Sequence, residues 1–170
     1  FGNEVRVADA KGKVASSGEE SEVQVSGQNV MQGYLKNKEA TREAFTPDGW
    51  YRTGDLGKMD EDGYVFITGR LKELIIKGGE NIAPREIDDV LYRHTGVLEA
   101  AAFPLPDVHY GQTVAAAIAP RPGENVPESA LRKICSAAMG EYRAPSRYFF
   151  LKELPKGPSG KIQRLKLTER

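Results

Sequence analysis

The chain has 170 residues, of which 39% are hydrophobic and 28% are charged, a composition typical of one globular domain or two small ones. Lys plus Arg and Asp plus Glu both number 24, so the formal net charge is zero. This balance excludes a global electrostatic attraction to nucleic acid or to an anionic membrane, and any anion site must be local.

The single cysteine, Cys135, lies on the apolar face of an expected helix, where a buried thiol acts as a small hydrophobe. One cysteine excludes a disulfide framework and a cysteine-based zinc site, and it fits a reducing, cytoplasmic compartment. No segment reaches the ~18 apolar residues of a membrane span, and no signal peptide is visible. Because the chain starts at Phe1 in a strand-like run, we expect a fragment of a longer protein.

The first part of the chain predicts antiparallel β structure with one helix. Valines alternating with polar residues predict strands over residues 4–8 and 22–26. Asn37 is a typical N-cap for a short helix over residues 38–45. Further strands are expected at 50–55, running into Thr53-Gly54-Asp55, and at 64–68, with turns at 47–49 and 60–63.

The second part predicts alternating strands and helices. A short strand is expected at 74–76, and Pro84 suits the first position of a helix. Apolar side chains then follow the i, i+3, i+4, i+7 stripe of a core-facing helix, namely Ile87, Val90, Leu91 and His94.

Strands rich in Ala, Val and Ile are expected at 97–103 and 113–119, and a last strand at 148–151. Pro127 opens a second helix, whose apolar face comprises Leu131, Ile134, Cys135 and Ala138. Residues 154–162 form a Gly/Pro/Ser loop that carries two lysines, and the boundary between the two parts is placed near residues 70–72.

Common motif tests exclude several chemistries. Lys161 follows a glycine, but Pro155 and Ile162 break the phosphate-loop pattern GxxxxGK[ST]. There is no GxGxxG, no HExxH and no G-x-S-x-G. Two histidines, His94 and His109, are the wrong number and spacing for a metal site, so no metal ligand is predicted and His94 is interpreted as packing or capping.

Four motifs in order resemble the adenylate-forming superfamily, which includes acyl- and aryl-CoA synthetases, adenylation domains of peptide synthetases and beetle luciferases. They are Tyr51-Arg52-Thr53-Gly54-Asp55, Gly69-Arg70-Leu71-Lys72-Glu73, Gly78-Gly79-Glu80-Asn81-Ile82 and residues 155–162, PKGPSGKI. Gly33-Tyr34-Leu35 with Thr41 resembles a further motif. The match covers essentially the whole chain, and the GGENI wording is more similar to CoA ligases than to peptide-synthetase domains.

The resemblance implies an α+β protein: an antiparallel β subdomain followed by a small mobile α/β C-terminal domain of the acyl-CoA synthetase type. Residues 1–69 would be the last β-rich subdomain of a truncated AMP-binding domain, and residues 70–170 the C-terminal lid. The Ser/Thr/Gly-rich phosphate loop and most of the acyl pocket of the family are absent from this sequence. The fragment alone is therefore expected to be inactive.

The implied chemistry has two steps: a carboxylate attacks the α-phosphate of ATP to give acyl-AMP and pyrophosphate, and the thiol of CoA then expels AMP. Lys161, at the end of a flexible loop, is the expected catalytic cation for the first step. An arbitrary lysine in a loop is interpreted as a solvated surface residue. The surrounding motif instead indicates that Lys161 is functional.

Asp55 is expected to accept both hydroxyls of the ATP ribose, against the alternative of an Asp in a turn. Arg70 is expected to contact ribose or phosphate, against the alternative of an ion pair with Glu73 or Asp55. Lys72 matches the hinge about which the family rotates its lid between the two half-reactions.

Gly78, Gly79 and Glu80 would line the tunnel for the pantetheine arm of CoA, against the alternative of an ordinary strand-to-helix turn. Some relatives have a lysine at the position of Ile76, whereas this chain has Lys77, which leaves a nucleotide contact from this loop open. Tyr110-Gly111-Gln112 with residues 84–88 resembles a branch acting on small acids such as oxalate.

The expected substrates of the parent enzyme are a carboxylic acid, ATP with Mg²⁺, and CoA, with no tightly bound cofactor in this fragment. The expected partner is the missing N-terminal domain of the same chain; neither nucleic acid nor a membrane span is expected. Two alternatives stay open: an adenylation domain that loads a carrier protein, and a non-catalytic nucleotide- or CoA-binding module.

Overall fold

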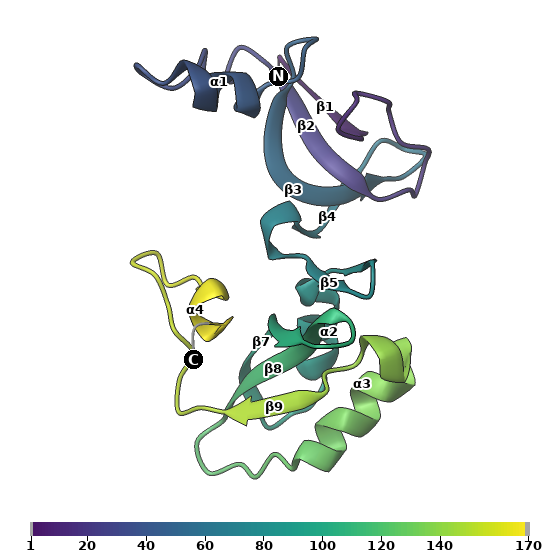
Figure 1. Ribbon diagram of the computed structural model, residues 1–170, viewed down its shortest axis with the longest axis vertical. Helices are drawn as coiled ribbons and strands as arrows, with labels where there is room; N and C mark the ends of the chain where they lie inside the picture. The colour runs from purple at the N-terminus through teal and green to yellow at the C-terminus, as the bar shows by residue number, and fades with distance from the viewer. Residues whose placement is uncertain (1, 169–170) are drawn as a thin grey trace. The chain divides into compact units, whose positions relative to one another are not determined.

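The computed structural model describes residues 2–168, and the chain divides into two compact units between Lys72 and Glu73. Unit 1 denotes the part up to Lys72, and unit 2 the part from Glu73 onward (Figure 1). The division lies at the downstream end of the expected boundary near residues 70–72, three residues after the expected end of the first domain at residue 69. That each unit is a particular domain of a larger enzyme stays a prediction.

Unit 1 is an antiparallel sheet with the strand order β1-β2-β3-β4 and one helix, α1. The elements are β1 (Asn3–Ala8), β2 (Ser21–Gly27), α1 (Lys38–Ala44), β3 (Tyr51–Met59) and β4 (Val65–Arg70). The side chain of Asn37 accepts a hydrogen bond from the backbone N–H of Ala40 at 3.0 Å, which confirms the predicted N-cap.

The third strand, β3, is longer than the sequence predicted: it continues through Asp55 to Met59. The ladder with β2 is irregular here, because the register shifts between Glu22 and Gln24. Side chains satisfy the displaced backbone groups, since Thr53 Oγ1 donates to the carbonyl of Val23 at 2.6 Å and Gly54 N–H donates to Glu22 at 3.2 Å. The irregularity is therefore absorbed as a bulge and does not end the strand.

Unit 2 is a mixed sheet with the strand order β6-β5-β8-β7, in which β9 pairs with β8 in parallel. A 3₁₀ turn, η1 (Leu71–Glu73), precedes it, and the elements are β5 (Ile75–Lys77), β6 (Glu80–Ile82), α2 (Pro84–Leu91), β7 (Val97–Asp107), β8 (Gly111–Pro120), α3 (Glu128–Arg143), β9 (Arg147–Phe150) and α4 (Leu165–Thr168). With the sheet of unit 1, this confirms the predicted α+β class.

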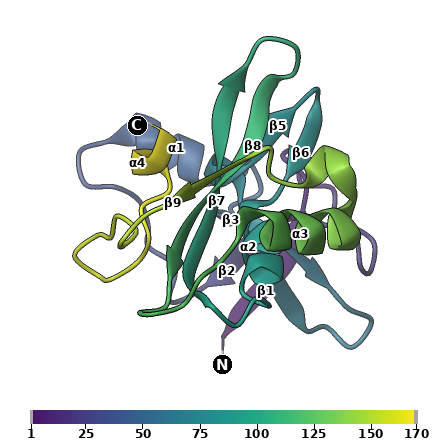
Figure 2. The same cartoon turned by 90° about the horizontal axis from the view of Figure 1, so that it is seen from below.

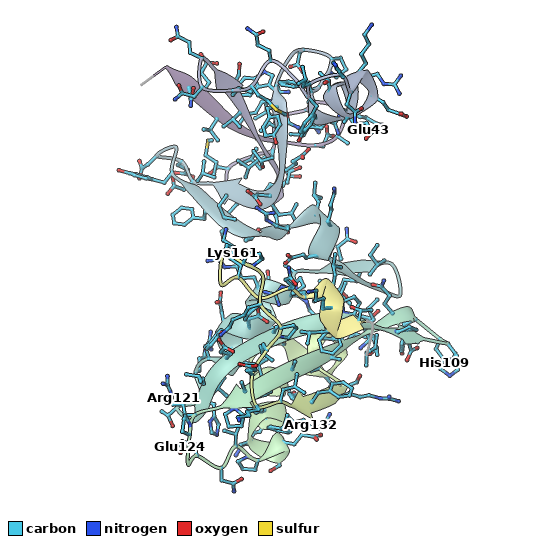
Figure 3. The ribbon with its side chains drawn as sticks, turned by 90° about the vertical axis from the view of Figure 1, so that its left-hand side faces the viewer. Glu43, His109, Arg121, Glu124, Arg132 and Lys161 are labelled. Atoms are coloured by element: carbon cyan, nitrogen blue, oxygen red, sulfur yellow. The ribbon has the colours of Figure 1, made fainter. Side chains whose placement is uncertain are left out.

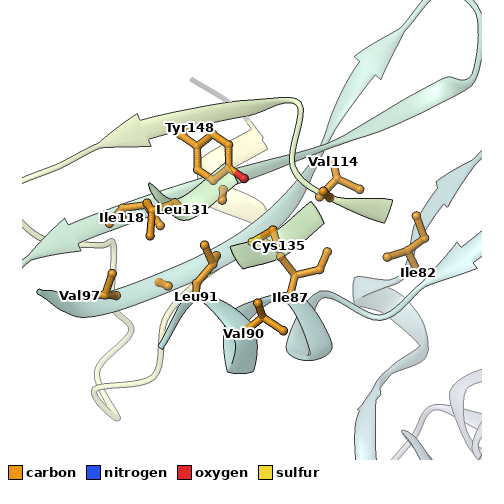
Figure 4. Packing of buried hydrophobic residues seen from close by; sticks show 14 of the residues in the cluster. Ile82, Ile87, Val90, Leu91, Val97, Val114, Ile118, Leu131, Cys135 and Tyr148 are labelled. Atoms are coloured by element: carbon orange, nitrogen blue, oxygen red, sulfur yellow. The ribbon is translucent and has the colours of Figure 1, made fainter. Parts of the chain in front are cut away.

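Strands β7 and β8 are buried on both faces, which explains why their sequences are almost continuously apolar. Ala100, Val114 and Ile118 point into a core shared with α2 and α3 (Figure 4). The alternate residues, such as Phe103 and Ala117, pack on the opposite face against Leu154 and Leu167. Figure 2 shows α2 and α3 on one side of these strands and α4 on the other.

Helix α2 begins at Pro84, as predicted, and buries Ile87, Val90 and Leu91. The predicted place of His94 in the helical stripe was wrong, because the helix ends at Leu91; the Nδ1 of His94 accepts the backbone N–H of Gly96 at 3.2 Å. The histidine thus serves the turn that follows the helix, as the capping interpretation expected.

Helix α3 buries Leu131 and Cys135, but Ala138 is exposed, so its predicted place on the apolar face was wrong. Met139 packs against the core in its place, because it continues the i, i+4 series from Cys135. Gly140 then interrupts the helix with φ 78° and ψ 161°. Within residues 2–168, no helix is long and apolar enough to cross a bilayer.

Candidate functional site

Lys161 lies in a closed loop that follows β9. The loop is held by backbone hydrogen bonds from Gly157 N–H to the Lys161 carbonyl at 2.9 Å and from Gln163 N–H to the Pro155 carbonyl at 2.8 Å. An isolated bridge between Lys156 and Ile162 adds to this closure. The lysine is thus held on a hairpin-like turn with a defined base.

The side chain of Lys161 is exposed and borders a cavity of about 460 Å³. Within the part of the chain that the structure describes, no carboxylate forms an ion pair with Lys161. The other lysine of the loop, Lys156, is instead paired with Glu99. Figure 3 shows Lys161 at the opposite end of unit 2 from Arg121 and Glu124. The ammonium is therefore available to an anionic ligand.

The base of this loop rests on a buried ion pair that the sequence analysis did not find. Arg164 forms a two-pronged contact with Asp88, which is 5% exposed. Burial raises the pKa of Asp88 above its usual range, and the adjacent guanidinium opposes that rise. Burial disfavours the charged form of Arg164, yet Asp88 and Glu73 still hold its pKa above the usual value. No sequence signal links residues this far apart in the chain.

Asp55 and Arg70 face each other across the β3–β4 ladder of unit 1. Arg70 Nε lies 2.8 Å from Asp55 Oδ1, and the two side chains are 61% and 27% exposed, respectively. The ion-pair interpretation of Arg70 is therefore realised in this structure. A contact from Asp55 or Arg70 to a nucleotide stays a prediction.

Next to this pair, unit 1 has a cavity of about 490 Å³ bordered by Glu22, Tyr34, Tyr51, Gly54 and Lys72. Neither Asp55 nor Arg70 lines it. Glu22 is only 7% exposed and accepts the backbone N–H of Gly54, so it fixes the backbone immediately before Asp55. Burial raises the pKa of Tyr51, with a contribution from Tyr34. Sequence reasoning missed Glu22, because only the fold brings it beside Gly54.

Gly78 and Gly79 form the tip of a hairpin between β5 and β6, and not the strand-to-helix turn considered as the alternative. Their φ angles are +54° and +87°, as a two-residue hairpin turn requires. A Cβ atom on Gly78 would lie 2.7 Å from the hydroxyl of Tyr142, whereas one on Gly79 would meet nothing within 4 Å. A role of this turn toward a ligand stays a prediction.

The residues beside the glycines join the hairpin to the end of α3. Lys77 is 6% exposed, and its ammonium donates to the Tyr142 carbonyl, while the Tyr142 hydroxyl donates to the Lys77 carbonyl at 2.8 Å. Glu80 lies 3.4 Å from Arg143, which also pairs with Glu86 at 2.7 Å. The ammonium of Lys77 also lies over the ring of Tyr142. A contact from Lys77 to a nucleotide stays an open question.

The predicted residues fall into three groups within the two units. Asp55 and Arg70 form one pair in unit 1, near Lys72 in sequence. Gly78, Gly79 and Glu80 share the β5–β6 hairpin of unit 2, and Lys161 lies in the loop before α4. Among residues 2–168, no three His, Cys, Asp or Glu side chains are grouped to hold a metal ion.

Residues 86–161 match the model of the AMP-binding enzyme C-terminal domain family. The chain is 55% identical over 166 residues to a sulfoacetate–CoA ligase of Cupriavidus necator, covering 98% of this chain and 33% of that protein. It is 41% identical over 163 residues to an oxalate–CoA ligase of Arabidopsis thaliana, covering 96% of this chain and 32% of that protein.

Among solved structures, the fold is similar to ATP-bound MatB from Rhodopseudomonas palustris, with a TM-score of 0.94 and 35% identity. The likeness covers 99% of this chain and 34% of MatB. The chain thus spans about one third of the length of the relatives that it matches.

Proposed function

We propose that the chain is the C-terminal part of a carboxylic acid–CoA ligase, because residues 86–161 match the model of the AMP-binding enzyme C-terminal domain family and because CoA ligases are among its relatives. The observation that supports this most strongly is the 55% identity to a CoA ligase across nearly the whole chain. Under this proposal, residues 1–69 complete a large AMP-binding domain and residues 70–170 form its mobile lid.

The proposed reaction has two displacements. In the first, a carboxylate oxygen of the acid attacks the α-phosphorus of ATP, the bond to the β-phosphate breaks, and pyrophosphate leaves. In the second, the sulfur of CoA attacks the acyl carbon, the bond to AMP breaks, and the thiol proton passes to solvent or a base. Mg²⁺ is expected to accompany ATP in the first step.

Lys161 has the properties required for the first displacement. Negative charge gathers on the α-phosphate and carboxylate oxygens as the bond forms, and a fixed ammonium placed there lowers the barrier. The closed loop presents Lys161 at its end without a carboxylate partner among residues 2–168. Lys161 is therefore the proposed catalytic cation.

Asp55 is proposed to hold the ribose of ATP. Arg70 Nε occupies Asp55 Oδ1, which orients the carboxylate, and the other oxygen stays available to a diol. The exposed remainder of the Arg70 guanidinium is suited to a phosphate or ribose oxygen. In this arrangement, the ion pair with Arg70 orients Asp55 for the ribose and does not compete with ribose binding.

Lys72 and the β5–β6 hairpin are proposed to serve the second displacement. Lys72 lies in the η1 turn where the two units meet in sequence, as a hinge residue must. Gly78, Gly79 and Glu80 form an exposed hairpin tip, and the open space beside Gly79 leaves room for the arm of CoA. Rotation about the hinge would bring this hairpin tip into the site after the adenylate has formed.

Two other functions are compatible with the fold: an adenylation domain that delivers to a carrier-protein thiol, and a binding module without catalysis. ATP–pyrophosphate exchange by the full-length protein separates catalysis from binding, since only an enzyme that forms an adenylate exchanges label. Supplying CoA or a phosphopantetheinyl carrier protein in the second step then identifies the acceptor. The CoA-ligase proposal is wrong if exchange occurs but only the carrier becomes acylated.

Substitution of Lys161 tests the assignment of the catalytic cation. In the full-length protein, Lys161→Ala is expected to lower adenylation by at least about 100-fold, because a preorganised charge at the transition state is lost. Attack of CoA on supplied acyl-AMP is expected to stay near the wild-type rate. Lys133→Ala, at an exposed lysine of α3, is the control and should retain adenylation. Equal losses in both half-reactions for Lys161→Ala would refute the assignment.

The names of the relatives guide the choice of acid. Sulfoacetate and oxalate each carry a second acidic group beside the reacting carboxylate. We therefore propose that the substrate is a small acid with a second anionic group. Steady-state measurements with such acids and with a fatty acid of similar solubility test this; a preference for the fatty acid of more than about tenfold in kcat/KM, ~1.4 kcal/mol, would contradict it.

A further inference from the structure

Arg164 forms the most densely bonded charged contact in the described part of unit 2. Its Nε donates to Glu73 at 2.9 Å, one terminal nitrogen donates to the Ala102 carbonyl at 3.0 Å, and both terminal nitrogens reach Asp88. Asp88 in turn accepts the backbone N–H of Ala102 at 2.7 Å. The guanidinium therefore joins the C-terminal segment to α2, to β7 and to the η1 turn.

The contact between Arg164 and Asp88 is held in one arrangement because both side chains are buried. The Arg164 and Asp88 side chains are only 16% and 7% exposed. A buried charge without partners costs several kcal/mol, so the guanidinium can hardly leave this arrangement while the domain is folded. The planar fork of an arginine also fixes orientation, which a lysine at the same place would not do.

Arg164 lies at the base of the loop that carries Lys161, so its contacts bear on the proposed reaction. The closed loop ends at the hydrogen bond between Gln163 and Pro155, immediately before Arg164. On the other side of the base, Leu154 is 2% exposed and donates its N–H to Glu99 at 3.4 Å. The loop is thus held at both of its ends, and Arg164 holds the end nearer to Lys161.

We propose that Arg164 is a positioning residue for Lys161: by gripping Asp88, Ala102 and Glu73, it fixes the base of the loop and thereby the place of the ammonium. This inference rests on the proposed function, in which Lys161 acts in adenylation. Because Glu73 directly follows Lys72, the same guanidinium also connects the loop to the residue next to the hinge.

The test compares two substitutions of Arg164 in the full-length protein. Arg164→Lys keeps the charge but loses the fork, and Arg164→Met loses both. We expect kcat for ATP–pyrophosphate exchange to fall about 10-fold in Arg164→Lys and about 100-fold in Arg164→Met, since small misplacements of a catalytic group have effects of this size. KM for ATP and attack of CoA on supplied acyl-AMP should change less than about threefold, because neither needs Lys161 in place.

The matched control is Arg121→Met. Arg121 is exposed, donates one hydrogen bond to the Thr95 carbonyl at 3.0 Å, and lies at the end of unit 2 opposite Lys161 (Figure 3). It should exchange at the wild-type rate. Hydrogen exchange gives a second readout independent of catalysis: amides of residues 156–163 should lose protection in Arg164→Lys, while those of β7 and β8 keep theirs.

The outcomes separate this inference from the proposed function. If wild-type protein does not exchange pyrophosphate, the proposed function fails and the inference fails with it. If wild type exchanges, Lys161→Ala does not, and Arg164→Lys matches wild type in both exchange rate and loop protection, only the positioning role is overturned. Equal losses of both half-reactions in Arg164→Lys would also overturn it, because they indicate a general structural role.

Discussion

At the scale of single residues, the two glycines of the β5–β6 hairpin show how similar positions carry different constraints. Both have φ angles in the left-handed region, at +54° for Gly78 and +87° for Gly79. Only Gly78 is also enclosed, since a Cβ there would lie 2.7 Å from the Tyr142 hydroxyl and 3.1 Å from the Tyr110 ring. The backbone requires glycine at both sites, and packing requires it at Gly78 alone.

Gly78→Ala and Gly79→Ala are therefore expected to differ in stability. The backbone strain is shared and costs about 1 kcal/mol in each, whereas the steric conflict at Gly78 raises its total loss to about 3 kcal/mol. The free energy of unfolding from urea titration measures both. Equal losses in the two variants would show that Tyr142 and Tyr110 move aside without cost.

The residue scale also separates what motif patterns reveal from what they hide. Lys161, Asp55 and Arg70 are found in short motifs, because each lies next to residues that resemble the same family. Asp88 and Arg164 are 76 positions apart, and their pairing depends on α2 and the C-terminal segment both reaching the backbone of Ala102 in β7. Glu22 was missed for the same reason, since 32 positions separate it from Gly54.

At the scale of elements, the η1 turn is the segment proposed to act as the hinge. It comprises Leu71–Glu73, contains no buried side chain, and lies where the two units meet in sequence. Its last residue, Glu73, contacts Arg164. The turn therefore buries none of its side chains, and one of them, Glu73, forms an ion pair with the rest of unit 2.

Lys72→Pro tests this element. A proline ring fixes φ near about −65°, so the residue could no longer absorb a rotation of the backbone. In the full-length protein, thioester formation is expected to fall at least about tenfold more than adenylation, because only the second half-reaction follows the rotation. Pre-steady-state measurement of each half-reaction gives the comparison.

Lys72→Ala is the matched control for the hinge, since it removes the charge but keeps the backbone free. It should leave the ratio of the two half-reactions near that of wild type. If Lys72→Pro also leaves this ratio unchanged, the hinge lies elsewhere in the chain.

At the scale of the whole molecule, the main fact is that this chain spans about one third of the relatives that it matches. The proposed site residues lie on both units, Asp55 and Arg70 on unit 1 and Lys161 on unit 2. The sequence has no phosphate-loop pattern. The proposed reaction therefore draws on residues of both units.

The 170-residue chain alone is expected to give no ATP–pyrophosphate exchange, because its sequence has no phosphate-loop pattern for the β- and γ-phosphates. Adding the preceding part of the full-length protein as a separate polypeptide should restore some exchange if the two parts associate. The full-length protein is the positive control. Exchange by the isolated chain would contradict the proposed division of the site.

The sequence by itself determined the fold class, most element positions, the capping of α1 by Asn37 and the identity of the candidate residues. These follow from local periodicity, turn chemistry and short motifs, which act over a few neighbouring positions. Only the tertiary structure decided that β3 continues through its bulge, that Gly78 and Gly79 close a hairpin, and that Arg164 grips Asp88 and Glu73. These features depend on hydrogen bonds and packing between distant segments, which no local pattern encodes.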